Sequence, residues 1–254
     1  MPTPIQPSNT APSLYPRDPA AYRQATELQL MAELLPLAGA RVLELGCGRA
    51  WMTRRLAEDF AVAEVIATEV DRIQHDRNLA IDDLPQVRFI YAGMESVPLE
   101  DGSVDIAIML KSLHHVPAEQ MAPGFAELYR VLRPGGLVYV SEPVYAGEFN
   151  AIMSLFNDEQ QVRQQAFEAL CQAVRQGLFV HQGQYFFESP GHFADWQEFE
   201  QRMLNVTHTQ HRIDAALYQR IKAAFEAHLT PTGADFLKPS RVDVLQKSDS
   251  LGGK

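Results

Sequence analysis

The sequence predicts an α/β protein whose parallel sheet is covered by helices on both faces. Short apolar runs alternate with stretches of helical period between residues 20 and 143, and a glycine-rich turn at residues 46–48 directly follows one of these runs. The composition, 46% hydrophobic and 21% charged, is that of a globular core. Because strands that alternate with helices pair in parallel, these observations favour one sheet with helical crossovers.

The first half of the chain supplies most of the expected sheet. A helix is predicted over residues 20–37, because Leu28, Met31 and Leu34 recur at helical spacing before Pro36 ends the run. Further helices are expected over 49–60, 72–80 and 118–132, and strands over 41–45, 63–70, 86–93, 104–110 and 137–143.

The pattern changes after Pro143, where residues 144–235 are expected to be mostly helical. Asp158 and Asp214 are candidate N-caps for two helices with clear apolar stripes, and a third apolar face begins at Trp196. This block interrupts the alternation of strands and helices, and we interpret it as an insertion that covers the substrate.

Three further segments complete the expected organisation. The aromatic run at 178–188 is typical of a hairpin that turns near Gly183, and residues 241–247 predict a last strand. Residues 1–19 are rich in Pro, Ser and Thr and predict a mobile N-terminal arm, which leaves 20–254 as one domain.

Charge and cysteine content exclude several classes of protein. Asp and Glu number 32 against 22 Lys and Arg, the net charge is -10, and no basic run occurs, so a nucleic-acid partner is not expected. No apolar run reaches membrane-spanning length, and the N-terminus does not resemble a signal peptide. Cys47 and Cys171 form neither a disulfide pattern nor a metal-ligand pattern. The sequence therefore predicts a cytoplasmic protein with no metal and no membrane partner, and it leaves the oligomeric state open.

The turn after "RVLEL" predicts a cofactor site, because a strand–glycine turn–helix unit points backbone N–H groups at a ligand. Dinucleotides and S-adenosylmethionine are both bound in this way. The dinucleotide fingerprint needs a third glycine where this chain has Trp51, which is expected to obstruct helix–strand packing. Glu44, two residues before Gly46, would repel a pyrophosphate but would attract a cationic amino acid, so it favours S-adenosylmethionine.

A second acid follows the next predicted strand. Glu69 lies 23 residues after Gly46, at a strand end where a carboxylate can accept hydrogen bonds from both ribose hydroxyls. Asp71 lies on the same side by period-two counting but farther out, so we prefer Glu69.

These segments resemble the class I S-adenosylmethionine-dependent methyltransferases, and most closely the small-molecule branch that includes ubiquinone and menaquinone biosynthesis enzymes. The matching stretches occur in the family's order over about residues 20–145: "VLELGCGRA", "VIATEVD", "VRFIYAGMESVPLEDGSVDIAIML", "SLHHV" and "LYRVLRPGGLVYVSEP". The resemblance implies a Rossmann-like seven-stranded sheet with helices on both faces and a helical lid inserted after strand 5.

The resemblance also implies which residues hold the methyl donor. The methionine end would lie against Glu44, Gly46, Cys47, Gly48, Arg49 and Lys111, the ribose against Glu69, and the adenine against Val70, Met94 and Glu95. The family usually has Gly-Asp where this chain has Ala92-Gly93. Either Glu95 replaces that aspartate as the acceptor for the adenine amino group, or water does.

Residues for catalysis and substrate binding are less distinct in the sequence. His115 and Glu142 are the candidate catalytic residues, because they follow the fourth and fifth predicted strands, where open α/β sheets place ligands. Packing and capping are the competing roles for these two. Tyr145 and Tyr185 are candidate substrate-binding residues, although an aromatic cluster is also typical of plain core.

The sequence as a whole predicts methyl transfer from S-adenosylmethionine to a small-molecule N, O or C atom. Alignment and exclusion of water would supply most of the catalysis. A methyltransferase acting on protein or RNA and a non-catalytic cofactor-binding protein remain alternatives, and a nicotinamide-dependent oxidoreductase is a more distant one.

Overall fold

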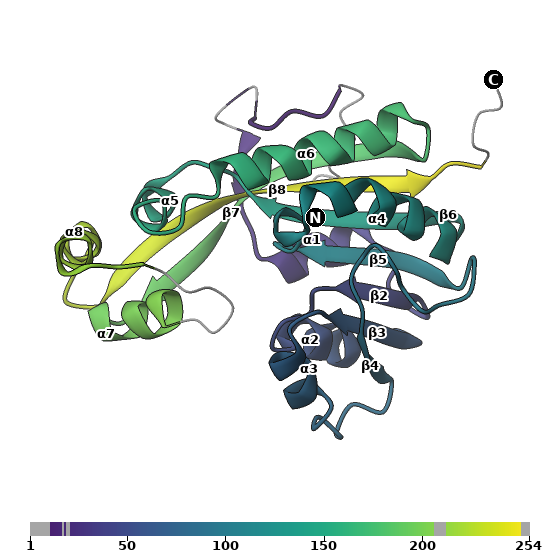
Figure 1. Ribbon diagram of the computed structural model, residues 1–254, viewed down its shortest axis with the longest axis horizontal. Helices are drawn as coiled ribbons and strands as arrows, with labels where there is room; N and C mark the ends of the chain where they lie inside the picture. Colours follow the sequence, from purple (N-terminus) through teal and green to yellow (C-terminus); the bar gives the residue numbers. More distant parts are fainter. Residues whose placement is uncertain (1–10, 17, 19–20, 206–211, 250–254) are drawn as a thin grey trace.

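The structure is a computed structural model that describes residues 11–16, 18, 21–205 and 212–249 (Figure 1). One eight-stranded sheet has the order β1-β7-β8-β6-β5-β2-β3-β4. Its strands are β1 (Arg23–Gln24), β2 (Arg41–Leu45), β3 (Glu64–Glu69), β4 (Val87–Tyr91), β5 (Val104–Leu110), β6 (Leu132–Pro143), β7 (Phe179–Phe193) and β8 (Ala234–Lys247). The helices are α1 (Glu27–Leu34), α2 (Trp51–Asp59), α3 (Arg72–Asn78), α4 (Ala118–Val131), α5 (Glu148–Met153), α6 (Gln160–Arg175), α7 (Trp196–Phe199) and α8 (Ala215–Glu226). A 3-10 turn, η2 (Leu113–His115), follows β5, and a π-helical turn, η3 (Glu200–Leu204), follows α7.

The strands from β2 to β6 are parallel, so their carboxyl ends lie at one edge of the sheet. β8 runs antiparallel between β6 and β7. The strand order reverses at β2, which pairs with β3 on one side and with β5 on the other. Open parallel sheets bind ligands outside the carboxyl ends of the strands at such a reversal. The region beyond the ends of β2, β3 and β5 is therefore the expected site.

Two apolar layers enclose this sheet, because successive side chains on a strand point to opposite faces. Leu43 and Leu45 pack in the layer that contains α4 and α6. Val42 packs in the layer that contains α1 and α2. Glu44 shares the period of Val42, so the strand directs its carboxylate toward α2.

A third apolar cluster lies at the far end of β7 and β8. Both strands extend beyond the rest of the sheet toward α5, α7 and α8 (Figure 1). We call this part the arm and define it as residues 147–156, 188–204 and 213–238. Its buried residues include Phe193, Phe199 and Phe225, and the ring centroids of the last two are 4.6 Å apart. The arm therefore has a small core of its own, separate from the two layers on the sheet.

The described part of the N-terminal segment contacts the sheet near β7 and β8. The backbone N–H of Ser13 donates to Oε1 of Gln184 over 3.0 Å, and Arg241 donates to the carbonyl of Leu14 over 3.4 Å. Within the described residues, no helix combines the length and the apolar character that crossing a membrane requires.

The α/β class with helices on both faces is confirmed, but the strand count is eight rather than seven. Arg23 and Gln24 pair with β7 as the short edge strand β1. The first helix is consequently shorter than the expected 20–37. It begins after Thr26, whose side chain and that of Gln29 form a capping box.

The expected hairpin at 178–188 is wrong. β7 continues through this segment to Phe193 and pairs with β8 along its whole length. Gly183 marks a register shift rather than a turn, and its lack of a side chain leaves room for the Tyr185 ring, since an added Cβ would lie 2.7 Å from the Tyr185 hydroxyl. The block at 144–235 therefore combines helices with a 15-residue strand.

Candidate active site

The glycine turn after β2 is held in a conformation that favours glycine. Gly46, Gly48 and Ala50 all have positive φ, at 72°, 52° and 57°. A Cβ on Gly46 would lie 2.9 Å from Cβ of Ser112, so this position excludes any side chain. The N–H groups of Gly46 and Cys47 donate to the carbonyl of Thr68. The turn is thus fixed against the ends of β3 and β5, beside the strand-order reversal.

Glu44 is buried directly beneath this turn. Its side chain accepts a hydrogen bond of 2.6 Å from the Thr53 hydroxyl of α2. Burial raises the pKa of the Glu44 carboxyl to about 7 against the effect of Thr53, and the charge of Glu69 adds to the rise. A carboxylate in this environment gains from a cation placed close to it.

Glu69, at the tip of β3, is satisfied by backbone donors. One carboxylate oxygen accepts from Gly48 N–H over 2.7 Å, and the other accepts from Val70 and Asp71 N–H over 2.8 and 2.9 Å. A carboxylate has about four lone-pair positions, so this conformation leaves about one for a ligand. Binding of both ribose hydroxyls would require the Gly48 N–H to turn aside. Asp71 is committed to capping α3 through Ile73 and Gln74.

The two acids influence the same small region. Each of them raises the pKa of the Cys47 thiol, which burial already raises well above its usual value. The thiol is therefore unreactive and serves as a packing group, with the Asn78 amide 3.4 Å from its sulfur.

In the segment after β4, a carboxylate lies over Gly93. A Cβ built on Gly93 would lie 2.3 Å from one carboxylate oxygen of Glu95 and 2.6 Å from the other. The Glu95 carboxylate thus occupies the space where a side chain at position 93 would begin. Met94 is buried against Gly124 of α4, so only its backbone can face a ligand, and Val70 is exposed.

Lys111 follows β5 in the left-handed conformation, with φ at 54°, and its N–H donates to the carbonyl of Ser141. A nearby acid, Glu27 of α1, has no signature in the sequence. It accepts hydrogen bonds from the Tyr139 hydroxyl over 2.6 Å and the Ser141 hydroxyl over 3.0 Å. Burial raises the pKa of Glu27, while these bonds and the charge of Lys111 oppose the rise. Glu27 thereby connects α1 to the end of β6.

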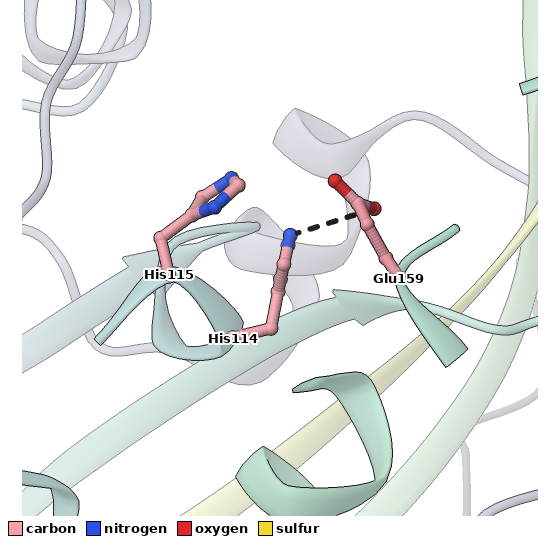
Figure 2. A group of neighbouring side chains, drawn as sticks. All are labelled: His114, His115 and Glu159. Carbon is pink, nitrogen blue, oxygen red and sulfur yellow. Dashed lines mark ion pairs between the residues drawn. The ribbon is translucent and has the colours of Figure 1, made fainter. Parts of the chain in front are cut away.

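The predicted catalytic residues lie in one cluster at the ends of β5 and β6, of which Figure 2 shows His114, His115 and Glu159. Glu142 is buried and contacts Nδ1 of His114 through one oxygen, while its other oxygen accepts from Leu113 N–H over 3.0 Å. His115 is exposed, and its ring centroid lies 4.1 Å from that of His114. Glu142 therefore forms a hydrogen bond with His114. Of the two predicted catalytic residues, His115 is exposed at the surface and Glu142 is buried.

Glu159, which the sequence analysis missed, belongs to the same cluster. It occupies the N-cap position of α6 without a capping hydrogen bond from its side chain, and one of its carboxylate oxygens lies 3.7 Å from Nε2 of His114. Its ion pair with Arg163 spans 2.6 Å. Burial opposes ionisation of Glu159, but the charges of His114 and Arg163 outweigh it and lower the pKa. In the sequence, the only indication of this role was the position of Glu159 directly after the predicted N-cap, Asp158.

A second group missed from the sequence is Lys238 on β8. Its Nζ lies 4.3 Å from the ring centroid of Phe149 and 5.2 Å from that of Phe193. Among the described residues, no carboxylate forms an ion pair with it. Burial, with the charges of Lys111 and Arg202, lowers the pKa of Lys238 to about 8. This cation has aromatic rings around it but no acidic partner.

Comparison with known proteins finds similarity to methyltransferases. Residues 42–136 match the family model described as a methyltransferase domain. The chain is 39% identical over 103 residues to an uncharacterized methyltransferase of Mycobacterium tuberculosis, and the alignment covers 41% of this chain and 40% of that protein. It is 38% identical over 111 residues to 27-O-demethylrifamycin SV methyltransferase of Amycolatopsis mediterranei, and this alignment covers 42% of this chain and 40% of that protein. The chain thus spans about two fifths of the length of these curated relatives.

Solved structures extend the likeness beyond the methyltransferase domain. The YcgJ protein of Bacillus subtilis has a TM-score of 0.59 at 18% identity and covers 88% of this chain and 98% of its own. The [4+2]-cyclase SpnF has a TM-score of 0.56 at 21% identity and covers 87% and 80%. At these identities the likeness concerns the fold alone, and one of the two proteins bears the name of a different reaction.

The site of the methyltransferase domain departs from the sequence-based expectations at three residues. Trp51 begins α2 with its side chain 62% exposed, so it does not obstruct helix–strand packing, and the argument against a dinucleotide rests on Glu44 instead. Tyr185 packs against the apolar layer of α1 rather than at the strand ends. Arg49 is exposed, so its side chain is not held in the turn. Tyr145 lies just beyond β6, and the centroid of its ring is 5.9 Å from Cζ of Arg163.

Proposed function

We propose that this protein transfers the methyl group of S-adenosylmethionine to a small-molecule acceptor. The observation that carries this proposal is the pair of buried acids, Glu44 and Glu69, at the ends of adjacent parallel strands beside a glycine turn. The match to a methyltransferase domain supports the same reading. A donor with a cationic amino-acid end and a ribose is complementary to these two carboxylates.

Each part of the donor has a suitable partner in the chain. Glu44 would attract the ammonium group, because its own carboxylate is buried and lacks a basic neighbour among the described residues. Glu69 would accept the ribose hydroxyls after the Gly48 N–H has turned. Glu95 would accept from the adenine amino group, since its carboxylate lies over Gly93. When bound, the sulfonium supplies an already activated methyl group.

Catalysis then depends mainly on the alignment of acceptor and donor. Good alignment of two reactants can lower the barrier by about 7–11 kcal/mol. The acceptor atom attacks the methyl carbon in line with the departing sulfur, and no covalent intermediate with the protein is needed. An acceptor that must lose a proton would face His115, which is the exposed member of the histidine pair, with His114 and Glu142 as positioning residues.

The arm supports an acceptor that is small and partly aromatic. Its core contributes Phe149 and Phe193, and Lys238 adds a cation among these rings. An acceptor with an acidic group would neutralise this cation. The net charge of -10 argues against an RNA acceptor.

Calorimetry with S-adenosylhomocysteine, the demethylated product of the donor, tests the proposal most directly. We expect stoichiometric binding that Glu69→Ala weakens at least about 100-fold. Purified protein that does not bind this nucleoside would contradict methyl transfer of any kind.

A second assay addresses the acceptor. Incubation of the protein with isotopically labelled donor and a metabolite extract should add one labelled methyl group to a low-molecular-mass compound. Label found only in protein or RNA would replace the small-molecule acceptor by a macromolecule, and binding without any transfer would indicate a non-catalytic protein.

A further inference from the structure

The cluster at the ends of β5 and β6 has a feature that proton transfer alone does not explain. Nδ1 of His114 contacts a carboxylate oxygen of Glu142, so the Nδ1 position carries the hydrogen and donates it. The other ring nitrogen, Nε2, lies opposite Oε2 of Glu159. An imidazole nitrogen and a carboxylate oxygen, both of them metal-ligand atoms, therefore face each other inside the protein.

The distance between these two atoms fits a shared cation better than a hydrogen bond. Nε2 of His114 and Oε2 of Glu159 are 3.7 Å apart, beyond the 2.7–3.2 Å of an N–H···O hydrogen bond. Zinc binds imidazole nitrogen at about 2.0–2.1 Å and carboxylate oxygen at about 2.0–2.2 Å, so two ligands of one ion lie roughly 3–4 Å apart. The gap between the two residues therefore has the width that a divalent ion requires.

A third ligand of the appropriate kind completes the cluster. The side chains of His114, His115 and Glu159 converge from η2 and from the beginning of α6 (Figure 2). One donor atom from each lies within 4.8 Å of the other two. Two imidazoles and one carboxylate form a ligand set that first-row transition metals bind in preference to magnesium or calcium.

The surrounding residues orient these ligands as an outer shell does in metal sites. Glu142 fixes the tautomer and the ring of His114, an arrangement common among metal-bound histidines. Asn157 donates to one oxygen of Glu159 over 2.8 Å, and Arg163 donates to the other. Because Arg163 would share this carboxylate with an ion, we expect weaker binding than in a structural zinc site.

We propose that His114, His115 and Glu159 bind a divalent transition-metal ion, and that this ion binds the oxygen of a hydroxyl acceptor. The second half of this statement rests on the proposed methyl transfer. Three protein ligands leave coordination positions open, as in catalytic metal sites. The ion would favour loss of the acceptor O–H proton to solvent. The oxygen would then form its bond to the methyl carbon as the carbon–sulfur bond breaks and leaves a neutral thioether.

Cobalt(II) is the probe for this site, since its visible absorption reports coordination by nitrogen and oxygen. Untagged full-length protein treated with a chelator should bind about one equivalent of cobalt(II) and develop a visible absorption band. His115→Ala and Glu159→Gln should each lower the affinity for cobalt(II) at least tenfold. The control is His192→Ala, which removes an exposed histidine paired with Asp235 at 2.8 Å and should leave cobalt binding unchanged.

Two outcomes would overturn the metal site. One is the same cobalt(II) affinity in wild type and His115→Ala. The other is the absence of a cobalt(II) absorption band from the chelator-treated wild type. S-adenosylhomocysteine binding, measured on the same samples by calorimetry, is independent of both, so the metal site and the proposed function can fail separately.

Discussion

The two ends of this molecule differ in how their residues are brought together. Around β2 and β3, the groups that would hold a donor lie within a few residues of a strand end, and backbone N–H groups fix them. In the arm, Phe149, Phe193 and Lys238 come from distant segments and meet only in the folded chain. The first region is built from local backbone geometry, whereas the second depends on tertiary packing.

We expect this difference to give the two regions separate tasks. A turn in which Gly46 excludes any side chain can accept only one ligand geometry, so we expect it to serve one donor. We expect the aromatic core of the arm, with Lys238 and Arg202 against its rings, to adapt to many acceptors by exchange of single side chains. Variants in the two regions should therefore change donor affinity and acceptor affinity independently.

Glu69→Ala should have the largest effect. Hydrogen bonds to a charged group contribute about 1.5–3 kcal/mol each, so loss of two ribose contacts should weaken S-adenosylhomocysteine at least about 100-fold in calorimetry. Asp71→Ala is the matched control, because it removes the cap of α3, should cost about 1 kcal/mol of stability, and should leave the affinity intact. An equal loss of affinity in both variants would show that the tip of β3 acts only as a structural support.

Glu44→Gln should separate stability from binding. The pKa of Glu44 is raised from 4.5 to about 7, so the folded state holds a proton that the unfolded state has already released between these pH values. The contribution of Glu44 to the free energy of unfolding therefore falls by about 3 kcal/mol as pH rises from 4.5 to 7. Above pH 7 this contribution is constant. At pH 8 the variant should melt at a higher temperature than wild type.

Donor binding should respond to Glu44 in the opposite direction. Wild-type affinity for S-adenosylhomocysteine should rise as pH increases through about 7, because the ionised carboxylate is the form that attracts the ammonium group. Glu44→Gln should show weaker and pH-independent binding over this range. A pH dependence that persists in the variant would assign the titration to another group.

Lys238→Met should have a moderate effect that is confined to acceptors with an acidic group. Loss of one charged partner should weaken 4-hydroxybenzoate about tenfold relative to its amide, 4-hydroxybenzamide. Wild-type binding of the acid should weaken as pH rises through about 8, where Lys238 loses its charge. Lys222→Met, which alters a half-buried lysine of α8 paired with Glu226, is the control. Equal binding of acid and amide to the wild type would remove Lys238 from the acceptor site.

Glu95→Ala should have the smallest effect, a loss of donor affinity of a few fold, because the side chain is exposed and water can replace it. The double variant Gly93→Asp with Glu95→Ala should recover the affinity if the two carboxylates serve the same adenine amino group. Affinity that stays reduced in the double variant would show that Glu95 has another role.

The arrangement of Glu44, Gly46 and Glu69 at neighbouring strand ends could be predicted from the sequence because local structure determines it. Glu44, Gly46 and Glu69 mark their own positions through a strand pattern and a turn that few residues can form. The same local reasoning failed at Trp51, where the identity of the residue was taken as evidence of packing although its side chain is exposed.

The surroundings of Glu159, Glu27 and Lys238 could not be predicted in this way. Glu159, Glu27 and Lys238 acquire their significance from partners more than ten residues away, and no spacing rule refers to such partners. The aromatic run around Gly183 was misassigned for a related reason, since a strand with a bulge and a hairpin share the same composition. Pairing with β8 along its length decided between them.

The separate core of the arm has a consequence for evolution. The arm is joined to the sheet by β7, β8 and the short connection before α5. We therefore expect substitutions or insertions around Phe199 and Phe225 to leave the strands that carry Glu44 and Glu69 undisturbed. Lineages that inherit this architecture can diversify the molecules they modify while retaining one source of the transferred carbon.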